Sequence, residues 1–228
     1  MAITGPITYF YSLEQFTPKG GSIFFVNTNN NSITFPPSSD WAVGTGDFTI
    51  DFFIYQTNNG NENFIFDLGT SDNLAVSVAS GGNKLNVYEN GTKTFNPSIT
   101  GNTNIWRYYA ISRKSSVMYI YENNYLAISG ANTSNITDSI SSFYIGCENP
   151  SNGTGDNWPG YITNFRFING TGLYGTSTIT VPVKPLGNII NTKLLLNTPN
   201  SNNFLYDSSI YNRVATNSGT TYSTLTPF

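Results

Sequence analysis

The residues best suited to chemistry lie in one stretch of the chain, residues 143–167. Two apolar segments, Phe143-Tyr144-Ile145 and residues 161–167, are predicted to be short strands. The loop between them consists largely of Gly, Asn, Asp and Pro, which favour turns and offer little to a core. We therefore expect this loop at the surface, where binding residues are commonly found.

Trp158 stands at the end of this loop, next to Asp156 and Asn157. An exposed aromatic ring can stack on the apolar face of a sugar, while amide and carboxylate groups bond its hydroxyls. Trp41, in a second loop, is also expected to be exposed. The candidate glycan-binding residues are Trp158, Asp156, Asn157, Tyr161 and Trp41. The alternative for Trp158 is that it folds back as a lid on the edge of the sheet.

The same loop carries groups that suit calcium, a hard cation that takes carboxylate, amide and main-chain oxygens. The candidate ligands are Asp156, Asn157, Asn152 and Glu148. The alternative is that these residues are turn formers, present for their backbone geometry. Calcium is therefore the one cofactor that the sequence leaves open.

Catalytic chemistry finds little support in the sequence. The chain has no His, which excludes Ser-His-Asp and Cys-His systems and His-ligated zinc. A retaining glycosidase needs two carboxylates about 5 to 5.5 Å apart. Asp47 and Asp51 would share one face of a strand, but with Cα atoms about 13 Å apart. We therefore expect no enzymatic activity, and a glycoside hydrolase is a remote alternative.

Composition narrows the class further. Only 10% of the 228 residues are charged, whereas 16 are Phe and 15 are Tyr. The net charge is −3 and Lys and Arg do not cluster, which argues against a nucleic-acid partner. No apolar run approaches the length of a membrane span, so no membrane partner is expected. Cys147 is the single Cys, and no internal disulfide can form.

Short alternating segments separated by turn residues run along most of the chain. The clearest is residues 48–55, which should place Phe48, Ile50, Phe52 and Ile54 in the core. In the next segment, Phe64, Phe66 and Leu68 alternate with Ile65 and Asp67. No amphipathic helix is predicted. The pattern indicates an all-β fold, a two-sheet antiparallel jelly-roll sandwich forming one domain over residues 1–228.

Five segments in this order resemble the laminin-G-like, concanavalin A-like jelly rolls. They are residues 46–54, 106–113, 118–123, 144–146 and 158–167, and the resemblance spans roughly Ser22 to Tyr174. It implies that Trp106 is a core aromatic, because the family buries an aromatic side chain at the start of that strand. It also implies a calcium site, which such domains often carry.

The C-terminal segment departs from the family pattern. The family usually opens with an apolar strand and an Asp-Ser-Ser turn, but here Leu194-Leu195-Leu196 and Asp207-Ser208-Ser209 stand at the other end. Either the domain is circularly permuted and the segment completes its own sandwich, or it completes a neighbour's and forms a homo-oligomer. The expected organisation is a core over residues 20–174, a wrapping loop over 175–190, and this C-terminal segment over 191–228.

A module of this kind with such a tail is similar to jelly-roll modules on bacteriophage and other virus particles. The resemblance implies a non-enzymatic protein of the virion surface, either a capsid decoration or part of a tail fibre or appendage. Its expected partners are other virion proteins and glycans on the host surface. The alternative is a secreted or cell-surface carbohydrate-binding lectin module, in an extracellular location.

Overall fold

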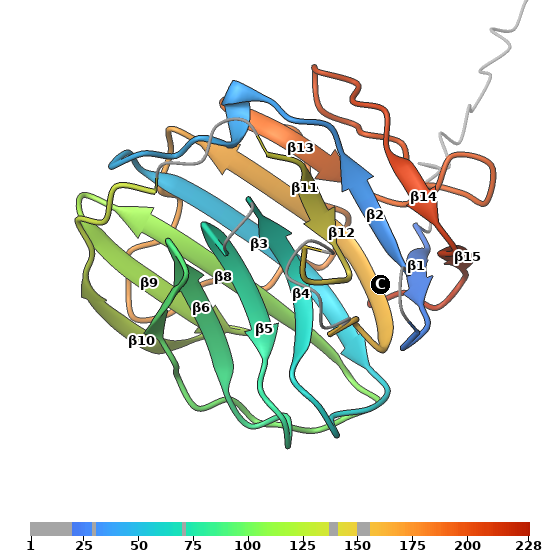
Figure 1. Cartoon of the computed structure of the whole chain (residues 1–228), viewed down its shortest axis with the longest axis horizontal. Coiled ribbons are helices and arrows are strands. Elements are labelled where there is room, and N and C mark those ends of the chain that lie inside the picture. Colours follow the sequence, from blue (N-terminus) through green and yellow to red (C-terminus); the bar gives the residue numbers. More distant parts are fainter. Residues whose placement is uncertain (1–19, 29–30, 70–71, 137–140, 150–155) are drawn as a thin grey trace, which may run out of the picture.

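The chain forms two antiparallel sheets that face each other across one core (Figure 1). The computed structural model describes residues 20–28, 31–69, 72–136, 141–149 and 156–228. Within this part, helical structure is limited to the 3-10 turn Ser39–Trp41, and no helix has the length and apolar character to cross a membrane. The predicted all-β jelly-roll sandwich is confirmed.

The two sheets differ in size. The eight-stranded sheet has the order β10 (Tyr125–Ala131), β9 (Val117–Glu122), β8 (Trp106–Lys114), β3 (Phe48–Gln56), β12 (Gly160–Asn169), β1 (Ser22–Phe25) and β15 (Thr221–Ser223), with β13 (Thr192–Leu196) also paired to β12. The seven-stranded sheet has the order β14 (Thr216–Ser218), β2 (Ser32–Phe35), β11 (Phe143–Ile145), β4 (Asn63–Leu68), β5 (Leu74–Val78), β6 (Leu85–Glu89) and β7 (Thr92–Phe95).

Aromatic side chains from both sheets fill the core. Phe52 of β3 lies stacked beside Phe165 of β12, with ring centroids 5.4 Å apart, and meets the edge of Phe66 from the opposite sheet at 6.1 Å. The four β3 residues predicted to face inward, Phe48, Ile50, Phe52 and Ile54, all lie in this core. The alternation of β3 therefore persists in the structure, and Thr49, Asp51, Phe53 and Tyr55 face outward.

The alternation of β4 is interrupted by a β-bulge. The pairing of β4 with β5 shifts register between Phe64 and Phe66. Ile65, Phe66 and Leu68 lie in the core, whereas Phe64 packs outside against Tyr88, with ring centroids 5.7 Å apart. The predicted placement of Phe64 on the face of Phe66 is wrong, because a bulge puts two residues opposite one and changes the face that follows.

The C-terminal segment contributes strands to both sheets of its own chain. β13 pairs with residues 165–168 of β12, and β1 pairs with residues 160–162 along the same edge. β14 pairs with β2, and β15 pairs with β1. Asp207 is fully buried after β13 and accepts hydrogen bonds from the backbone of Leu195, Ser209 and Arg213. The carboxylate therefore holds this segment against its own sandwich.

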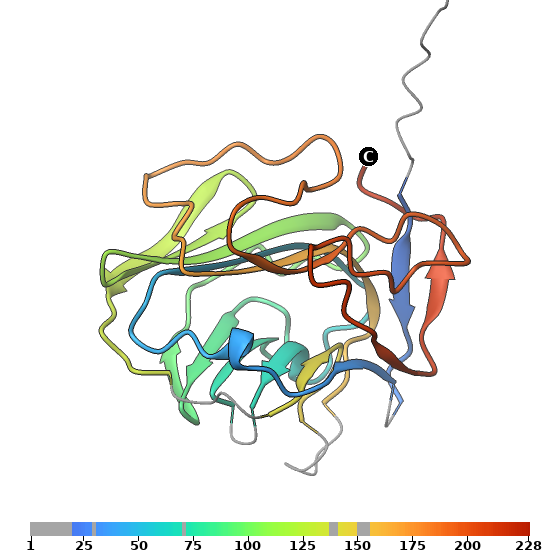
Figure 2. The same cartoon turned by 90° about the horizontal axis from the view of Figure 1, so that it is seen from above.

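Residues 171–187 run across the outer face of the eight-stranded sheet (Figure 2). Tyr174, Ile179 and Val181 pack there on a second apolar cluster centred on Phe53 and Tyr108. Backbone groups of the segment also bond outward-facing side chains, as where the Tyr174 N–H donates to Ser112 Oγ at 3.2 Å. The outer face of this sheet is consequently covered over much of its area.

Candidate functional site

The loop that follows β11 folds back on β4. The backbone N–H of Phe64 donates to the carbonyl of Asp156 at 3.1 Å, and the Asn63 side-chain amide donates to the carbonyl of Asn157 at 2.9 Å. At the start of the loop, the Asn149 N–H donates to Asp67 Oδ2 at 2.8 Å. The two described ends of the loop are thus both fixed to one central strand, β4.

Both candidate tryptophans are in the core. Trp158 is 0% exposed and Trp41 is 1% exposed. Trp41 packs edge-on against Phe143 at 5.3 Å, and its indole N–H donates to the Pro36 carbonyl at 3.0 Å. The prediction that Trp41 is exposed is wrong, and for Trp158 the burial favours the alternative in which the ring folds back onto the sandwich, because burying an indole contributes a large hydrophobic free energy. Neither ring offers a face to a sugar.

The other candidates for glycan binding are dispersed. Asn157 is buried, and Asp156 is half-buried, with its backbone carbonyl bonded to β4. Tyr161 lies on β12, paired with Tyr55, and so belongs to the outer face of the opposite sheet. Trp158 and Tyr161 are close in the sequence and are therefore predicted to lie together. In the structure the Trp158 ring lies in the core, whereas Tyr161 lies on the outer face of the eight-stranded sheet.

The structure describes three of the four candidate calcium ligands. Asn152 lies outside the described residues. Glu148 lies near Asp67 of β4, close enough for its charge to raise the pKa of that carboxyl. Within the described part of the chain, no group of three or more His, Cys, Asp or Glu side chains gathers as a metal site. The predicted four-ligand set stays a prediction, and its member Glu148 lies near a further acid, Asp67.

Asp67 is the unusual acid of this region. Its side chain is 0% exposed and its Oδ1 has no hydrogen-bond partner. Burial, with the nearby carboxyls of Asp72 and Glu148, raises the pKa of Asp67 to about 8. The Asp67 and Asp72 carboxyls can hydrogen-bond through one shared proton, because two like charges so placed do not both ionise readily.

The amino-acid sequence itself carries a signal that points to Asp67. Asp67 is the one acid inside the otherwise apolar run of β4. A carboxylate in a fully buried strand is retained only with a compensating partner.

A polar network lies beside this pair on the same outer face. Glu62 accepts hydrogen bonds from Ser77 Oγ, from the Asn86 amide at 2.6 Å and from the Tyr88 hydroxyl at 2.7 Å. Burial would raise the pKa of Glu62, but these bonds and Lys93 lower it below its usual value. Tyr88 is half-buried, and the charge of Asp72 is one of the causes that raise its pKa. An aromatic ring and hydrogen-bonding groups therefore border the carboxyl pair.

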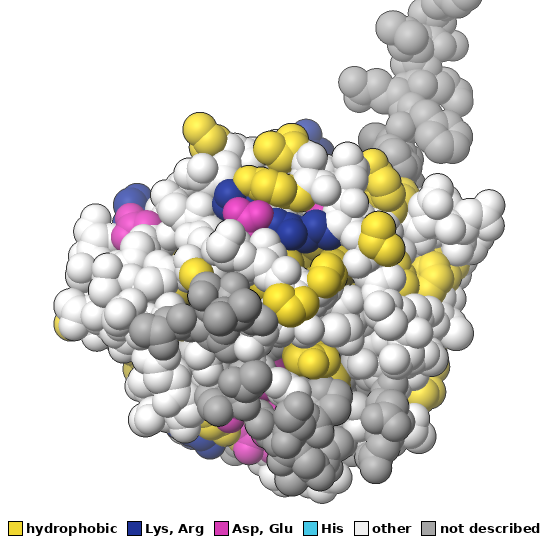
Figure 3. Space-filling model, turned by 45° about the horizontal axis from the view of Figure 1, so that its top comes forward, with side chains coloured by type: hydrophobic (Ala, Val, Ile, Leu, Met, Phe, Trp, Pro, Cys, Tyr) yellow, Lys and Arg dark blue, Asp and Glu magenta, His cyan; other side chains and the backbone are white. Residues whose placement is uncertain are grey.

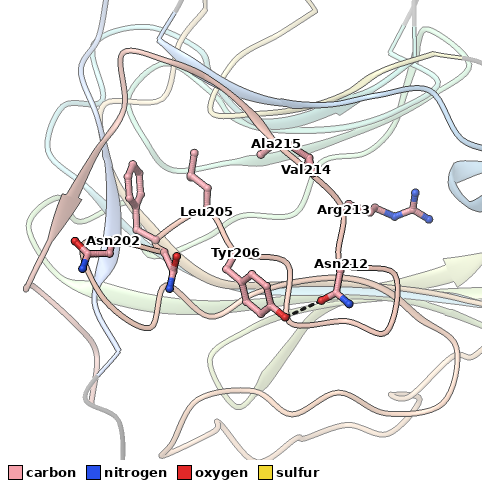
Figure 4. A pocket seen from close by; sticks show the side chains of 9 residues that line it. Asn202, Leu205, Tyr206, Asn212, Arg213, Val214 and Ala215 are labelled. Atoms are coloured by element: carbon pink, nitrogen blue, oxygen red, sulfur yellow. Dashed lines mark hydrogen bonds between the residues drawn. The ribbon is translucent and has the colours of Figure 1, made fainter.

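The C-terminal segment forms a separate open pocket of about 390 Å³ (Figure 4). Amide side chains, among them Asn202 and Asn212, line it together with Tyr206, whose hydroxyl donates to Asn212 Oδ1 at 2.7 Å. Arg213 at its side forms an ion pair with Asp40 and lies 4.3 Å from the ring of Trp41. The single cation of the pocket, Arg213, is thus already paired with Asp40. Figure 3 shows that the charged side chains on the face of the molecule drawn there lie in a few small groups.

Asp51 is the acid that a hydrolase would need on the other sheet. It is fully buried and forms a bidentate ion pair with Arg166, with Nε to Oδ1 at 2.9 Å. The hydroxyls of Tyr108 and Tyr174 donate to its Oδ2 at 2.7 and 3.0 Å. Burial and the Asp51 charge raise the pKa of Tyr108. Asp51 is therefore a satisfied structural carboxylate, lying under the segment 171–187.

Comparisons with known proteins place this architecture. The family model described as "Concanavalin A-like lectin/glucanases superfamily", of the laminin G type, matches residues 27–171, which is more than half of the chain. A comparison with curated protein sequences finds no significant match.

Several solved structures share the fold at low sequence identity. A heptameric SAP-like pentraxin from Limulus polyphemus is 17% identical, with a TM-score of 0.61 and coverage of 90% of this chain and 95% of that one. A proposed carbohydrate binding protein from Bacteroides ovatus is 15% identical, with a TM-score of 0.59, and the match covers 90% of this chain and 60% of that one. The CBM40 domain of Ruminococcus gnavus IT-sialidase is 11% identical, with a TM-score of 0.50 and coverage of 65% and 95%. At these identities the likeness concerns the fold.

Proposed function

Because the chain belongs to the concanavalin A-like lectin/glucanase superfamily, we propose that it is a non-catalytic glycan-binding module with a cation-dependent site at Asp67. The observation that carries the proposal is the unpartnered, fully buried Oδ1 of Asp67. A solitary acceptor of this kind has a desolvation cost that a bound cation would offset.

Calcium fits the groups that surround Asp67. It takes six to eight oxygen ligands, mostly carboxylates, amide and main-chain carbonyls and water. Asp67 and Asp72 would supply carboxylates, and Glu148 lies within electrostatic reach of them. Since no three acidic side chains gather as a metal site among the described residues, an ion bound there would have most of its coordination positions open to water and to the hydroxyls of a sugar. Tyr88 and the polar groups around Glu62 would then contact the rest of the sugar.

The ligand class rests on the comparisons. Similar folds occur in a proposed carbohydrate binding protein and in the carbohydrate-binding domain of a sialidase. The proposed non-catalytic role is supported by Asp51, whose two oxygens are bonded to Arg166 and two tyrosines. This interpretation is nearer to the lectin alternative than to the virion module. The virion surface, with virion proteins as partners, stays a prediction, as does an extracellular location.

The test is binding of the purified chain to a panel of glycans, with calcium and with a chelator. Asp67→Asn and Asp72→Asn should lose the chelator-sensitive binding, and calorimetry with calcium chloride alone should lose its heat of binding in Asp67→Asn. Asp47→Asn is the matched control, because Asp47 accepts from the Ser115 N–H on a distant hairpin. A folded protein that binds neither calcium nor any glycan in the presence of calcium would overturn the proposal.

A further inference from the structure

Four aromatic residues form one cross-strand row on the outer face of the eight-stranded sheet. Phe24 of β1 pairs with Tyr161 of β12, Tyr161 pairs with Tyr55 of β3, and Tyr55 pairs with Trp106 of β8. Four adjacent strands thus place an aromatic side chain at the same level. We call this set the aromatic row.

The rings of the aromatic row are in contact. The centroids are 4.9 Å apart for Phe24 and Tyr161, 5.5 Å for Tyr161 and Tyr55, and 5.6 Å for Tyr55 and Trp106. Strands lie about 4.8 Å apart, so the row extends over about 14 Å. All four side chains are half-buried. The row is therefore partly open to solvent.

The fold allows this close pairing through Gly160. Its φ is +137°, and a Cβ at this position would lie 2.0 Å from the carbonyl oxygen of Tyr55. Any side chain at residue 160 would push β12 away from β3 next to Tyr161. The register of the aromatic row thus depends on a glycine directly before it.

Other aromatic residues on the same outer face are covered by segments of the chain. The neighbouring aromatic residues Phe53 and Tyr108 are covered by the segment 171–187 and by Phe228, whose ring centroid lies 5.3 Å from that of Phe53. Trp106 touches the edge of this covered cluster, whereas Tyr55 and Tyr161 lie outside it. The chain therefore buries one aromatic patch under its own loop and leaves the adjacent row partly open. The prediction that Trp106 lies in the core is wrong, because its strand position places the ring on the outer face, where it is half-buried beside this cluster.

Polar, uncharged groups border the aromatic row. Thr221 of β15 pairs with Phe24, so it lies at one end of the row, and its side chain is exposed. Thr57 follows β3 and is exposed, and Asn104 precedes β8 and is also exposed. Hydroxyl and amide groups beside aromatic rings suit a ligand with apolar C–H faces and many hydroxyls. The row carries no charge that would recruit an acidic or basic partner.

From this arrangement we propose that the aromatic row is a second binding surface, for an extended, uncharged polysaccharide chain. The choice of a glycan rests on the proposed function, but the surface does not require a cation. It lies on the outer face of the eight-stranded sheet, whereas Asp67 lies on the outward side of the seven-stranded sheet. Because neighbouring rings of the row are tilted or edge-on to one another, a polysaccharide would stack on some rings, contact the edges of others, and bond the hydroxyls and amides at its borders.

Trp106 provides a direct readout on the unmodified protein. Of the three tryptophans, Trp41 and Trp158 are buried in the core, so quenching by acrylamide should report mainly on Trp106. Soluble neutral polysaccharides, such as xylan, dextran and hydroxyethyl cellulose, are titrated in the presence of EDTA. We expect saturable binding by at least one of them and protection of Trp106 from acrylamide. A folded protein that binds none of the panel in EDTA overturns the proposal.

Two variants then locate the binding. Tyr55→Leu and Tyr161→Leu keep apolar volume but remove the ring, and each should lower affinity at least tenfold. Tyr125→Leu is the matched control, since Tyr125 is 67% exposed on β10 and outside the row. Equal affinity for the polysaccharide in the row variants and in the control overturns the proposal. The proposal is also overturned if the chain binds a protein partner but binds no polysaccharide in EDTA.

The two proposals fail separately. Asp67→Asn should leave the binding in EDTA unchanged, whereas the row variants should leave the heat of calcium binding unchanged. Glycan binding that needs calcium and is lost only in Asp67→Asn would support the cation site and overturn the aromatic row.

Discussion

The outer faces of the two sheets each bury an aspartate in a central strand, with opposite results. Asp51 of β3 meets Arg166 and two tyrosine hydroxyls, so every oxygen is satisfied. Asp67 of β4 accepts one backbone N–H and otherwise faces other acids. A buried carboxylate with good hydrogen-bonding and charged partners stabilises the fold, whereas one beside like charges takes up a proton or a counter-ion. The two aspartates thus differ in their partners, Asp51 having a cation beside it and Asp67 having other acids.

The largest effect should come from removing the satisfied acid. Asp51→Ala would leave the Arg166 guanidinium buried without its ion pair, and breaking such a pair costs about 3–5 kcal/mol. Urea unfolding at neutral pH measures the loss. Asp67→Ala, measured in the same way in chelator, should cost far less, and similar losses in both variants would remove the distinction between the two acids.

The second effect is a pH dependence of opposite sign to that of an ordinary carboxylate. The pKa of Asp67 is about 8 in the folded chain, above its unfolded value, so the folded state binds the proton more tightly. In chelator, stability should therefore increase as pH falls from about 8 to about 6, by at most about 1.4 kcal/mol per pH unit. The chain has no His, so few other groups titrate in this window.

Asp67→Asn provides the control for this pH dependence. Its free energy of unfolding should be nearly constant between the same pH values, and saturating calcium should flatten the wild-type curve as well. A wild-type curve in chelator that is flat, or that loses stability as pH falls, would contradict the shifted pKa and weaken the cation site with it.

A third, smaller effect on stability should come from removing a tyrosine hydroxyl on either outer face. Tyr108→Phe removes a fully buried hydrogen bond to Asp51 and should cost about 1 kcal/mol. Tyr88→Phe removes a bond to Glu62 from a half-buried ring and should cost less, because water can replace it there. Thermal unfolding of the two variants orders them. A larger loss in Tyr88→Phe would place the more rigid network on the seven-stranded sheet.

The smallest expected effect concerns Lys93. Its ammonium lies 5.3 Å from the Tyr88 ring and is exposed, so Lys93→Ala should change the free energy of unfolding by less than about 0.5 kcal/mol. Glu62 would remain held by Ser77, Asn86 and Tyr88. A loss above about 1 kcal/mol would show that the charge of Lys93, more than the hydrogen bonds, stabilises Glu62.

The fold class and much of the core could be predicted from the amino-acid sequence alone. Period-two alternation in residues 48–55 specifies which side chains face inward, since successive residues of a strand point to opposite faces. The absence of His and the scarcity of charge likewise restrict the chemistry that the chain can perform. These conclusions need only local geometry and composition.

The composition of the candidate site depends on contacts between segments that are distant in the sequence. The polar neighbours of Trp158 say nothing about where its ring packs, and the ring enters the core because the loop returns to β4. The bulge in β4 and the approach of Asp72 to Asp67 depend on pairing between segments, as does the register that brings Phe24, Tyr161, Tyr55 and Trp106 into one row. Alternation fixes the face of a side chain, but its neighbours across strands are fixed by register, which a single segment does not contain.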